Sequence, residues 1–346
     1  MKKKATFDFI DLCAGIGGLR IPFDAKKNNN PLLQGTCVFS SEIDANARKV
    51  YAEYFEDDES HIDRDFTLLT NLTKKTEAGS SAGFGVPAHD LLLAGFPCQP
   101  FSHAGLKNGF EDTRGTLFFS IATIIAKRKP KVILLENVRG LVSHDEGRTL
   151  GRILEILKDP EKGTKTKDRV KYFVPQPKLL NARDFGLPQN RVRLFIVAIR
   201  EDVAKESLFE WPEATHDKNS LVVGKELQKR VDDSFTISTR LWQGHIARKD
   251  RNLKAGKGFG YQLFSPRDKY VATISARYYK DGSEALISQP GRNPRKLTPE
   301  EVRNLQGFPK DFRLGASKIQ SYRQLGNAVP VPVVAAIAAK LQKYLT

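Results

Sequence analysis

The sequence predicts an α/β protein with a Rossmann-like, mostly parallel sheet, helices on both faces, and a smaller irregular region. Three observations predict it. Short apolar runs alternate with helix-like segments over the first two thirds of the 346 residues. A glycine-rich turn follows the first apolar run. The regular alternation stops near residue 200. Alternating strands and helices are typical of parallel sheets covered on both faces, and this length usually holds more than one domain.

The elements follow from periodicity and from helix start and stop signals. Strands are expected at 7–13, 36–44, 90–96, 131–138 and 193–200. Helices are expected at 45–55, 115–130 and 147–159. Residues 201–295 are polar and irregular. Order returns at 298–308, a helix begun by Thr298 and Pro299, and at 330–345, a strongly apolar closing helix.

The charge balance favours a polyanionic partner. Lys and Arg number 56 against 40 Asp and Glu, a net charge of +16, which puts nucleic acid ahead of an anionic membrane. The stretch from Lys225 to Lys257 contains nine basic and four acidic residues, with aromatic residues and glycines between them. That mixture suits a loop-rich surface that contacts phosphates and bases. A basic protein with a solvated, ligand-free region is the alternative.

The cysteine usage and the apolar runs exclude other classes. The three cysteines, Cys13, Cys37 and Cys98, match neither a disulfide framework nor a metal site. We therefore expect a reduced compartment and no bound metal. Asp8 and Asp11 interrupt the apolar part of the N-terminal segment, and no stretch approaches the ~20 apolar residues of a membrane span. We therefore expect neither a signal peptide nor a membrane partner.

A nucleotide-type pocket is expected at the turn "DLCAGIGGLR", which places Gly15, Gly17 and Gly18 between a strand and a helix. Glycines allow a tight turn and a close approach of backbone to ligand, although a purely structural turn would also use them. Glu42 ends the second strand, where an acid can accept hydrogen bonds from ribose hydroxyls. The absence of a G-x-G-x-x-G pattern suggests an adenosine ligand without a pyrophosphate.

Chemistry-bearing side chains stand at three successive strand ends. Cys98 lies between two prolines in "GFPCQPFS", which stiffen its loop. Glu136 closes the next apolar run, where a carboxylate is costly to bury without a partner. Arg191 and Arg193 begin a further strand on one side of it. These groups are either a buried thiol, a core ion pair and surface cations, or one converging site.

Seven motifs, in order along nearly the whole chain, resemble those of the DNA (cytosine-5)-methyltransferases of bacterial or phage type. They are "DLCAGIGG", "GFPCQPFS", "DTRGTLFF", "ENV", "PQNRVR", "RKLTPEEVRNLQGFP" and "QLGNAVPVPV". One short motif can arise by chance, whereas this ordered series is specific.

The resemblance implies a catalytic mechanism. Cys98 would attack carbon 6 of cytosine and make carbon 5 nucleophilic enough to accept a methyl group. Glu136 would grip ring nitrogen 3 and the exocyclic amine, and Arg193 the carbonyl oxygen. Arg191 would help to position the site, while Gln99 and Ser102 would help to close the loop. The base must be flipped out of the stack, since its reacting carbons are shielded in a duplex.

The resemblance also implies a cofactor. The methyl donor would be S-adenosyl-L-methionine, and S-adenosyl-L-homocysteine the product. Asp65 or Asn71 would contact adenine, and we favour Asp65. The positions matching the family's cofactor site are Phe9, Ala14, Gly15, Gly17, Gly18, Glu42, Ile43, Asp65, Pro97, Leu117, Asn327 and Val329.

The expected organisation follows from the same resemblance. Residues 1–199 and 322–346 would form the S-adenosylmethionine-binding catalytic domain, and 200–321 the smaller target-recognition domain. The enzyme would act as a monomer on double-stranded DNA in the bacterial cytoplasm. It would belong to a restriction–modification system, and the sequence leaves open whether a separate restriction endonuclease accompanies it. The target site cannot be decoded from the sequence.

Three other functions share part of this sequence pattern. A transfer RNA cytosine-5 methyltransferase shares the motifs, but that branch has little separate recognition sequence. A catalytically inactive DNA-binding homologue would be expected to have lost Cys98 or Glu136, and both are present. A dinucleotide oxidoreductase would need the missing glycine and leaves the Cys98 loop unexplained.

The basic region supports a first prediction. Neutralising Lys249, Arg251 and Lys254 together should weaken binding to all DNA sequences alike. Each cation that contacts a phosphate contributes about one unit to the slope of log affinity against log salt, so the slope should flatten. Affinity for S-adenosylmethionine should not change. A variant that binds DNA normally but loses the cofactor would show that the two domains are assigned the wrong way round.

Overall fold

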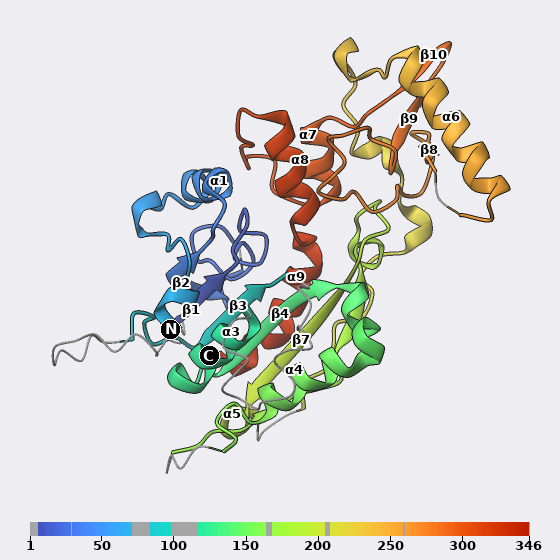
Figure 1. Ribbon diagram of the computed structural model, residues 1–346. Helices are drawn as coiled ribbons and strands as arrows, with labels where there is room; N and C mark the ends of the chain where they lie inside the picture. Colours follow the sequence, from blue (N-terminus) through green and yellow to red (C-terminus); the bar gives the residue numbers. More distant parts are fainter. Residues whose placement is uncertain are drawn as a thin grey trace.

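A seven-stranded sheet forms the larger part of the protein in Figure 1. The computed structural model describes residues 6–28, 30–70, 84–97, 117–163, 168–204, 208–258 and 260–345. Four residues named from the sequence lie outside the described residues: Asn71, Cys98, Gln99 and Ser102.

The sheet has the strand order β2-β1-β3-β4-β7-β5, with β6 also paired to β7. The neighbours β2-β1, β1-β3 and β3-β4 are parallel. β7 runs antiparallel to β4, β5 and β6, and the chain reverses between β6 and β7 through residues 182–191. The mostly parallel sheet is confirmed, with this one reversed strand. The strands are β1 (Thr6–Leu12), β2 (Gln34–Ser41), β3 (Leu91–Gly95), β4 (Val132–Val138), β5 (Tyr172–Phe173), β6 (Lys178–Asn181) and β7 (Val192–Arg200).

Helices cover both faces of the sheet. α3 (Leu117–Arg128) and α4 (Arg148–Lys158) pack on one face, and α9 (Val331–Leu341) packs on the other. Successive strand residues point to opposite faces, so in β3 Leu92 joins the α3 side and Leu93 the α9 side. Central strands buried on both faces explain the uninterrupted apolar runs in the sequence.

A smaller region lies above the sheet in Figure 1. It contains a three-stranded sheet in the order β10-β9-β8. Its elements are β8 (Leu263–Phe264), β9 (Leu286–Gln289), β10 (Arg292–Arg295), α6 (Thr239–Lys254), α7 (Pro299–Leu305) and α8 (Lys318–Asn327). A third apolar cluster joins these elements to α1 (Ala45–Phe55) of the larger part.

Local signals explain several helix starts. Asp44 caps α1 by accepting from the backbone N–H groups of Asn46 and Ala47. α7 begins with the expected Thr298, whose side chain forms a capping box with Glu301. The remaining short helices are α2 (Thr67–Thr70), α5 (Glu201–Ala204) and 3-10 turns at Glu59–His61, Arg139–Val142, His144–Gly147, Ala182–Phe185, Lys218–Ser220, Val223–Lys225, Asp233–Phe235 and Gln342–Tyr344.

The helix α6 departs from the irregular surface expected over 201–295. It has 16 residues and runs through the most basic part of the chain. His245 is its one buried residue among those described. With so few buried positions, the segment has too weak an apolar stripe for sequence periodicity to detect.

Segment 318–344 is the one described stretch that is long and apolar enough to cross a membrane by length and composition. It consists of α8 and α9, separated at Ala328–Pro330, and 61% of its most apolar window is buried in the protein. We interpret this stretch as two helices of the protein core.

The position of this break bears on the domain boundary. Residue 322 lies within α8, and Tyr322 and Leu325 pack with the smaller region. Val329, Val333 and Val334 pack with the large sheet, whereas Val331 still belongs to the cluster that contains the smaller region. We therefore propose that the chain returns to the catalytic domain at about residue 328 rather than 322, with the first boundary near 200 as expected.

Asp11 at the end of β1 supports a prediction about stability. Its carboxylate is buried, accepts a 3.2 Å hydrogen bond from Tyr51 Oη, and its Oδ1 has no partner among the described residues. Burial raises the pKa of Asp11 to about 8, against the opposing charge of Arg20. Between about pH 4 and 8 the folded state therefore holds a proton that the unfolded state has lost, so stability falls as pH rises.

Asp11→Asn should remove this dependence. We expect the melting temperature of the variant to fall less between pH 5 and 8 than that of the wild type, measured by thermal denaturation in matched buffers. Two parallel profiles would contradict the assignment.

Candidate active site

A cavity of about 640 Å³ opens where the parallel strands end. It lies beyond the carboxyl ends of β1 to β4 and beside the first residues of the reversed β7, the place where open α/β sheets bind ligands. Residues distant in sequence meet there. The predicted site residues that line it are Ala14, Gly15, Gly18, Glu42, Ile43, Asp65, Pro97, Leu117, Glu136, Arg193, Asn327 and Val329.

The glycine turn forms one wall of the cavity. Gly15 has a φ of +55° and donates its N–H to Glu42 Oε2 over 2.8 Å. A Cβ on Gly18 would lie 2.9 Å from Val329 Cγ2. Gly17 is needed for another reason, since its φ is +85° and a Cβ there would lie 2.2 Å from Phe55 Cε2. The turn therefore requires glycine for packing as well as for ligand approach.

Glu42 already has two backbone partners. Besides the bond from Gly15, its Oε1 accepts from the N–H of Asp44 over 2.8 Å. These bonds fix the carboxylate at the cavity, and its remaining lone pairs are available to a ligand hydroxyl. Cys13, which the sequence analysis gave no role, also lines the cavity. Burial raises the pKa of the Cys13 thiol, so it stays protonated and acts as a small apolar group.

The far end of the cavity combines an acid with an exposed apolar side chain. Asp65 Oδ1 accepts from the backbone and hydroxyl of Thr67, at 3.1 and 2.5 Å. Ile43 is 77% exposed at the rim, which is unusual for isoleucine. An apolar face beside a fixed carboxylate suits a flat ring with exocyclic N–H donors.

Glu136 and Arg193 form a buried ion pair in the cavity wall. Their Oε1 and Nε atoms are 3.1 Å apart, and Glu136 is only 7% exposed. Burial raises the pKa of Glu136, against the charges of Arg193 and Arg191. The Glu136 Oε1 atom makes no hydrogen bond with good geometry to any described residue. That oxygen is the one that lies 3.1 Å from the Arg193 guanidinium, and both residues of the pair line the cavity.

Asn137 fixes the start of the Cys98 loop. Its side-chain amide donates to the carbonyl oxygen of Phe96 over 2.8 Å, and its Oδ1 accepts from the N–H of Val138. Phe96 and Pro97 directly precede Cys98. Asn137 was not among the predicted site residues, although its position beside Glu136 in "ENV" indicates a place at the same strand end.

Arg191 lies behind the cavity and does not line it. It is fully buried, and its guanidinium donates to the carbonyl oxygens of Ile274, Gly326 and Ala328 over 2.9, 2.7 and 2.6 Å. These bonds tie the beginning of β7 to the smaller region and to the break between α8 and α9. Arg191 is thus placed as a positioning residue.

The comparisons with known proteins agree with this geometry. The family model described as C-5 cytosine-specific DNA methylase matches residues 7–343. The chain belongs to this family. It is 45% identical to the Type II methyltransferase M.DsaV of Dactylococcopsis salina, over 99% of this chain and 88% of that protein. It is 46% identical to the Type II methyltransferase M.NlaX of Neisseria lactamica, over 98% and 97%.

A solved structure supports the fold of this methylase. The Entamoeba histolytica methyltransferase EhMeth superposes with a TM-score of 0.66 and 19% identity, covering 98% of each chain. Family membership and the Type II relatives establish the chain as a DNA cytosine-5 methyltransferase. Membership also implies DNA as the substrate and S-adenosylmethionine as the methyl donor. The oxidoreductase interpretation is thereby excluded.

Some residues predicted for the methylase's site lie elsewhere. Phe9 is fully buried in the core, with its ring 6.2 Å from that of Phe7 and 6.5 Å from that of Phe23. Gly17 packs on α1, as described above. The structure therefore does not bring Phe9 or Gly17 to the cavity wall.

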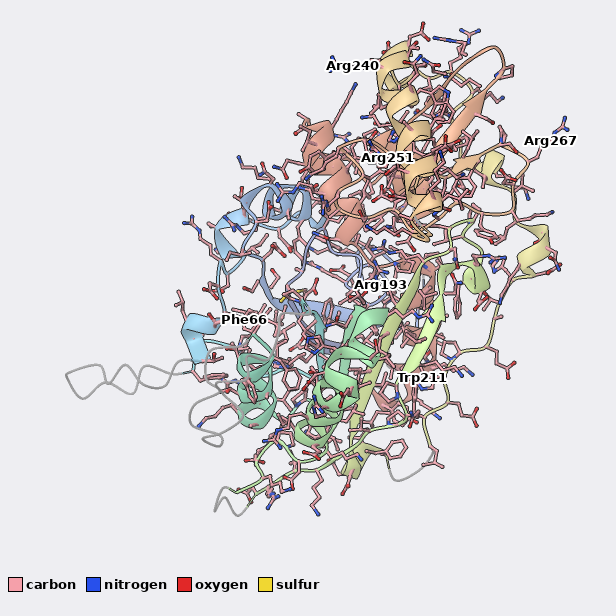
Figure 2. The ribbon with its side chains drawn as sticks, turned by 45° about the vertical axis from the view of Figure 1, so that its right-hand side comes forward. Phe66, Arg193, Trp211, Arg240, Arg251 and Arg267 are labelled. Carbon is pink, nitrogen blue, oxygen red and sulfur yellow. The ribbon has the colours of Figure 1, made fainter. Side chains whose placement is uncertain are left out.

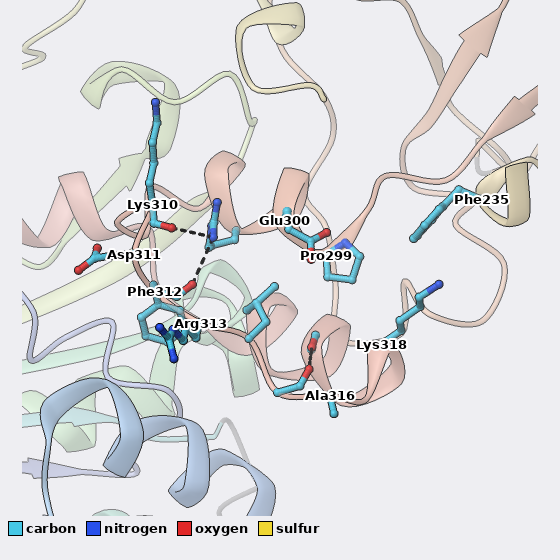
Figure 3. Close-up of a pocket in the computed structure, with 13 residues that line it drawn as sticks. Phe235, Pro299, Glu300, Lys310, Asp311, Phe312, Arg313, Ala316 and Lys318 are labelled. Carbon is cyan, nitrogen blue, oxygen red and sulfur yellow. Dashed lines mark hydrogen bonds between the residues drawn. The ribbon is translucent and has the colours of Figure 1, made fainter. Parts of the chain in front are cut away.

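A second cavity of similar volume lies between α7, α8 and the loop before α8, and Figure 3 shows it. Its Arg303 is held by the carbonyl oxygens of Lys310 and Phe312, over 3.0 and 3.3 Å. The ammonium of Lys318 lies 4.6 Å from the centre of the Phe235 ring. These bonds and contacts stabilise the loop. None of the described residues predicted for catalysis or cofactor binding lines this cavity.

The buried pair in the first cavity supports a prediction. Glu136→Gln keeps the shape but removes the charge, so methyl transfer should slow by roughly two orders of magnitude or more, the usual range for acid–base groups. Single-turnover methylation of duplex DNA would measure it. Binding of S-adenosylhomocysteine should persist, and the exposed Glu155→Gln on α4 should keep the wild-type rate. An unchanged rate in Glu136→Gln would assign that residue a structural role alone.

Proposed function

We propose that this enzyme transfers the methyl group of S-adenosylmethionine to carbon 5 of a flipped cytosine in a specific duplex site, through a covalent bond from Cys98 to carbon 6. The observation that carries the proposal is the buried Glu136–Arg193 ion pair, both of whose residues line the same cavity as the glycine turn.

The residues present fit the cofactor. Glu42, anchored by Gly15, would accept from the ribose hydroxyls. Asp65 would accept from the adenine amine, and Ile43 would cover the ring. A Cβ built on Gly15 meets nothing within 4 Å, so this wall leaves room for a ligand. When bound, the cofactor supplies an electrophilic methyl group.

The roles proposed for the protein's groups follow from the chemistry of cytosine. The Cys98 thiolate adds to carbon 6, and the electron pair displaced from the ring double bond makes carbon 5 nucleophilic. Glu136 holds ring nitrogen 3 and the exocyclic amine, and Arg193 holds the carbonyl oxygen, so both stabilise the charge that develops on the ring. After methylation, loss of the proton from carbon 5 expels the thiolate and restores the aromatic ring.

The burial of this pair supports base flipping. Glu136 and Arg193 are both largely buried, so neither can reach a base stacked within a duplex. A cytosine must leave the stack to meet them, as other enzymes that modify bases require. Gln99 and Ser102 would help to close the Cys98 loop over the flipped base.

The wider setting is also part of the proposal. Residues 1–199 together with the segment from about 328 would hold the cofactor and catalyse, and the region between would recognise the target. The Type II names of the relatives suggest a restriction–modification system, with any endonuclease acting separately. The enzyme would work as a monomer in the bacterial cytoplasm.

Replacement of the nucleophile tests the mechanism. Cys98→Ser should abolish methyl transfer and leave DNA binding largely intact. Duplex DNA carrying 5-fluorocytosine should trap the wild type as a covalent adduct, because fluorine at carbon 5 cannot leave as the proton does. Gel electrophoresis under denaturing conditions would detect the adduct.

A control variant and a second substrate complete this test. Cys37→Ser changes a thiol on β2 that does not line the cavity, so this variant should stay active. Appreciable turnover by Cys98→Ser would rule out the covalent route. Methylation of transfer RNA in preference to duplex DNA would overturn the proposed substrate.

A further inference from the structure

Helix α6 has one face that contacts the protein and an opposite face that is open. The open face, called here the outer face of α6, consists of the exposed residues at helical spacing: Arg240, Gln243, Gly244, Ala247, Asp250, Arg251 and Lys254. Steps of three and four residues place these side chains on one stripe along the helix.

The inner face is firmly anchored. His245 is buried, and its Nε2 lies 3.2 Å from the carbonyl oxygen of Asp281. Arg248 forms a 3.0 Å ion pair with the Asp281 carboxylate. The ring centres of Trp242 and Tyr261 are 4.7 Å apart in an edge-to-face arrangement. The Lys249 ammonium lies 4.5 Å from the centre of the Tyr261 ring. These contacts orient α6 as a rigid element and fix which side chains point outward.

The outer face of α6 carries positive charge at both of its ends. Its cations stand at the two ends, Arg240 at one and Arg251 with Lys254 at the other. In the part of the chain that the structure describes, none of the three forms an ion pair. Figure 2 shows α6 with Arg240 at its upper end and Arg251 further down, on the side toward Arg193.

The middle of the outer face is narrow. Gly244 and Ala247 have no side chain beyond a methyl group, and a Cβ built on Gly244 would meet nothing within 4 Å. The backbone can therefore approach a surface closely at this point. Gln243, one turn after Arg240 on the same face, offers both a hydrogen-bond donor and an acceptor.

These dimensions match the major groove of B-form DNA. Arg240 and Lys254 are fourteen residues apart, so their backbones lie about 21 Å apart along the helix. A major groove is about 12 Å wide and admits an α-helix. With the middle of α6 in the groove, the terminal cations reach the phosphates on either side. The deep, narrow major groove of RNA would exclude the helix.

We propose that the outer face of α6 enters the DNA major groove, with Gln243 at the edge of a base pair and Arg251 and Lys254 on flanking phosphates. This inference rests on the proposed function and adds a specificity-determining residue to it. It also divides the cations named from the sequence, because Lys249 packs on Tyr261 and contributes no phosphate contact.

Gln243→Ala tests the base contact. Methylation of a library of duplexes with randomised sequence, read by bisulfite sequencing, would give the preference at each position. We expect the variant to lose roughly 10- to 100-fold preference at one base-pair position and to keep it elsewhere, as removal of one base contact implies. Unchanged preferences at every position would overturn the assignment of Gln243.

The phosphate contacts have a separate readout. The double variant Arg251→Ala with Lys254→Ala should bind all duplexes more weakly, lower the salt slope by about two units and keep the wild-type site preference. Lys249→Ala on the inner face and the exposed Lys340→Ala on α9 are matched controls that should keep the wild-type slope. The proposed orientation of α6 would be contradicted by an unchanged salt slope in the double variant. It would also be contradicted if Lys249→Ala lowered the salt slope by about one unit, the amount expected for each outer cation.

Different results would refute the proposed methyltransferase mechanism and the proposed role of α6. A wild-type enzyme that methylates no cytosine and forms no adduct with 5-fluorocytosine DNA would refute the proposed function. An active wild type whose α6 variants retain its specificity and salt slope would refute only the role of α6. S-adenosylhomocysteine binding by each variant confirms that the large domain is folded.

Discussion

The buried guanidinium of Arg191 is the interaction on which the arrangement of the two parts depends. Its N–H groups donate to three backbone carbonyl oxygens, those of Ile274, Gly326 and Ala328. Burial of an arginine without a partner would be prohibitive, and each hydrogen bond from a charged group recovers about 1.5–3 kcal/mol. Gly326 completes the junction, since a Cβ there would lie 2.3 Å from the backbone nitrogen of Ala276. One side chain thus holds the sheet, the smaller region and the start of α9 together.

The direction of β7 makes this junction part of the active site. The parallel strands β1, β3 and β4 bring their carboxyl ends to one edge of the sheet, and the reversed β7 brings its beginning there. Arg193 lies opposite Val138 in the β4–β7 register and reaches diagonally to Glu136, two residues after the arginine that anchors the smaller region. A parallel β7 would have placed Arg193 at the opposite edge.

Sequence reasoning was reliable where a residue's chemistry determines its place. Glycine turns, strand-ending acids and apolar runs predicted the sheet, its two covered faces and the part of the cavity wall formed by Gly15, Glu42 and Glu136, whereas Asp65, Leu117 and Asn327 came from the family resemblance. The direction of β7 was missed because an apolar run looks the same in both directions. Helix α6 was missed because a helix held by His245, Arg248 and two aromatic rings needs no apolar stripe. The cofactor role of Phe9 came from the family resemblance, and the side chain instead packs with Phe7 and Phe23 in the core.

The late position of α9 in the chain has a consequence for biosynthesis. One whole face of the large sheet packs against this helix, which is made only after every residue of the smaller region. On the ribosome, strands β1 to β7 therefore emerge with that apolar face uncovered, and domains normally fold as units during synthesis. The smaller region can acquire its shape while the larger part is still incomplete. A nascent chain halted before residue 331 would present an apolar surface to chaperones and could not assemble its catalytic core.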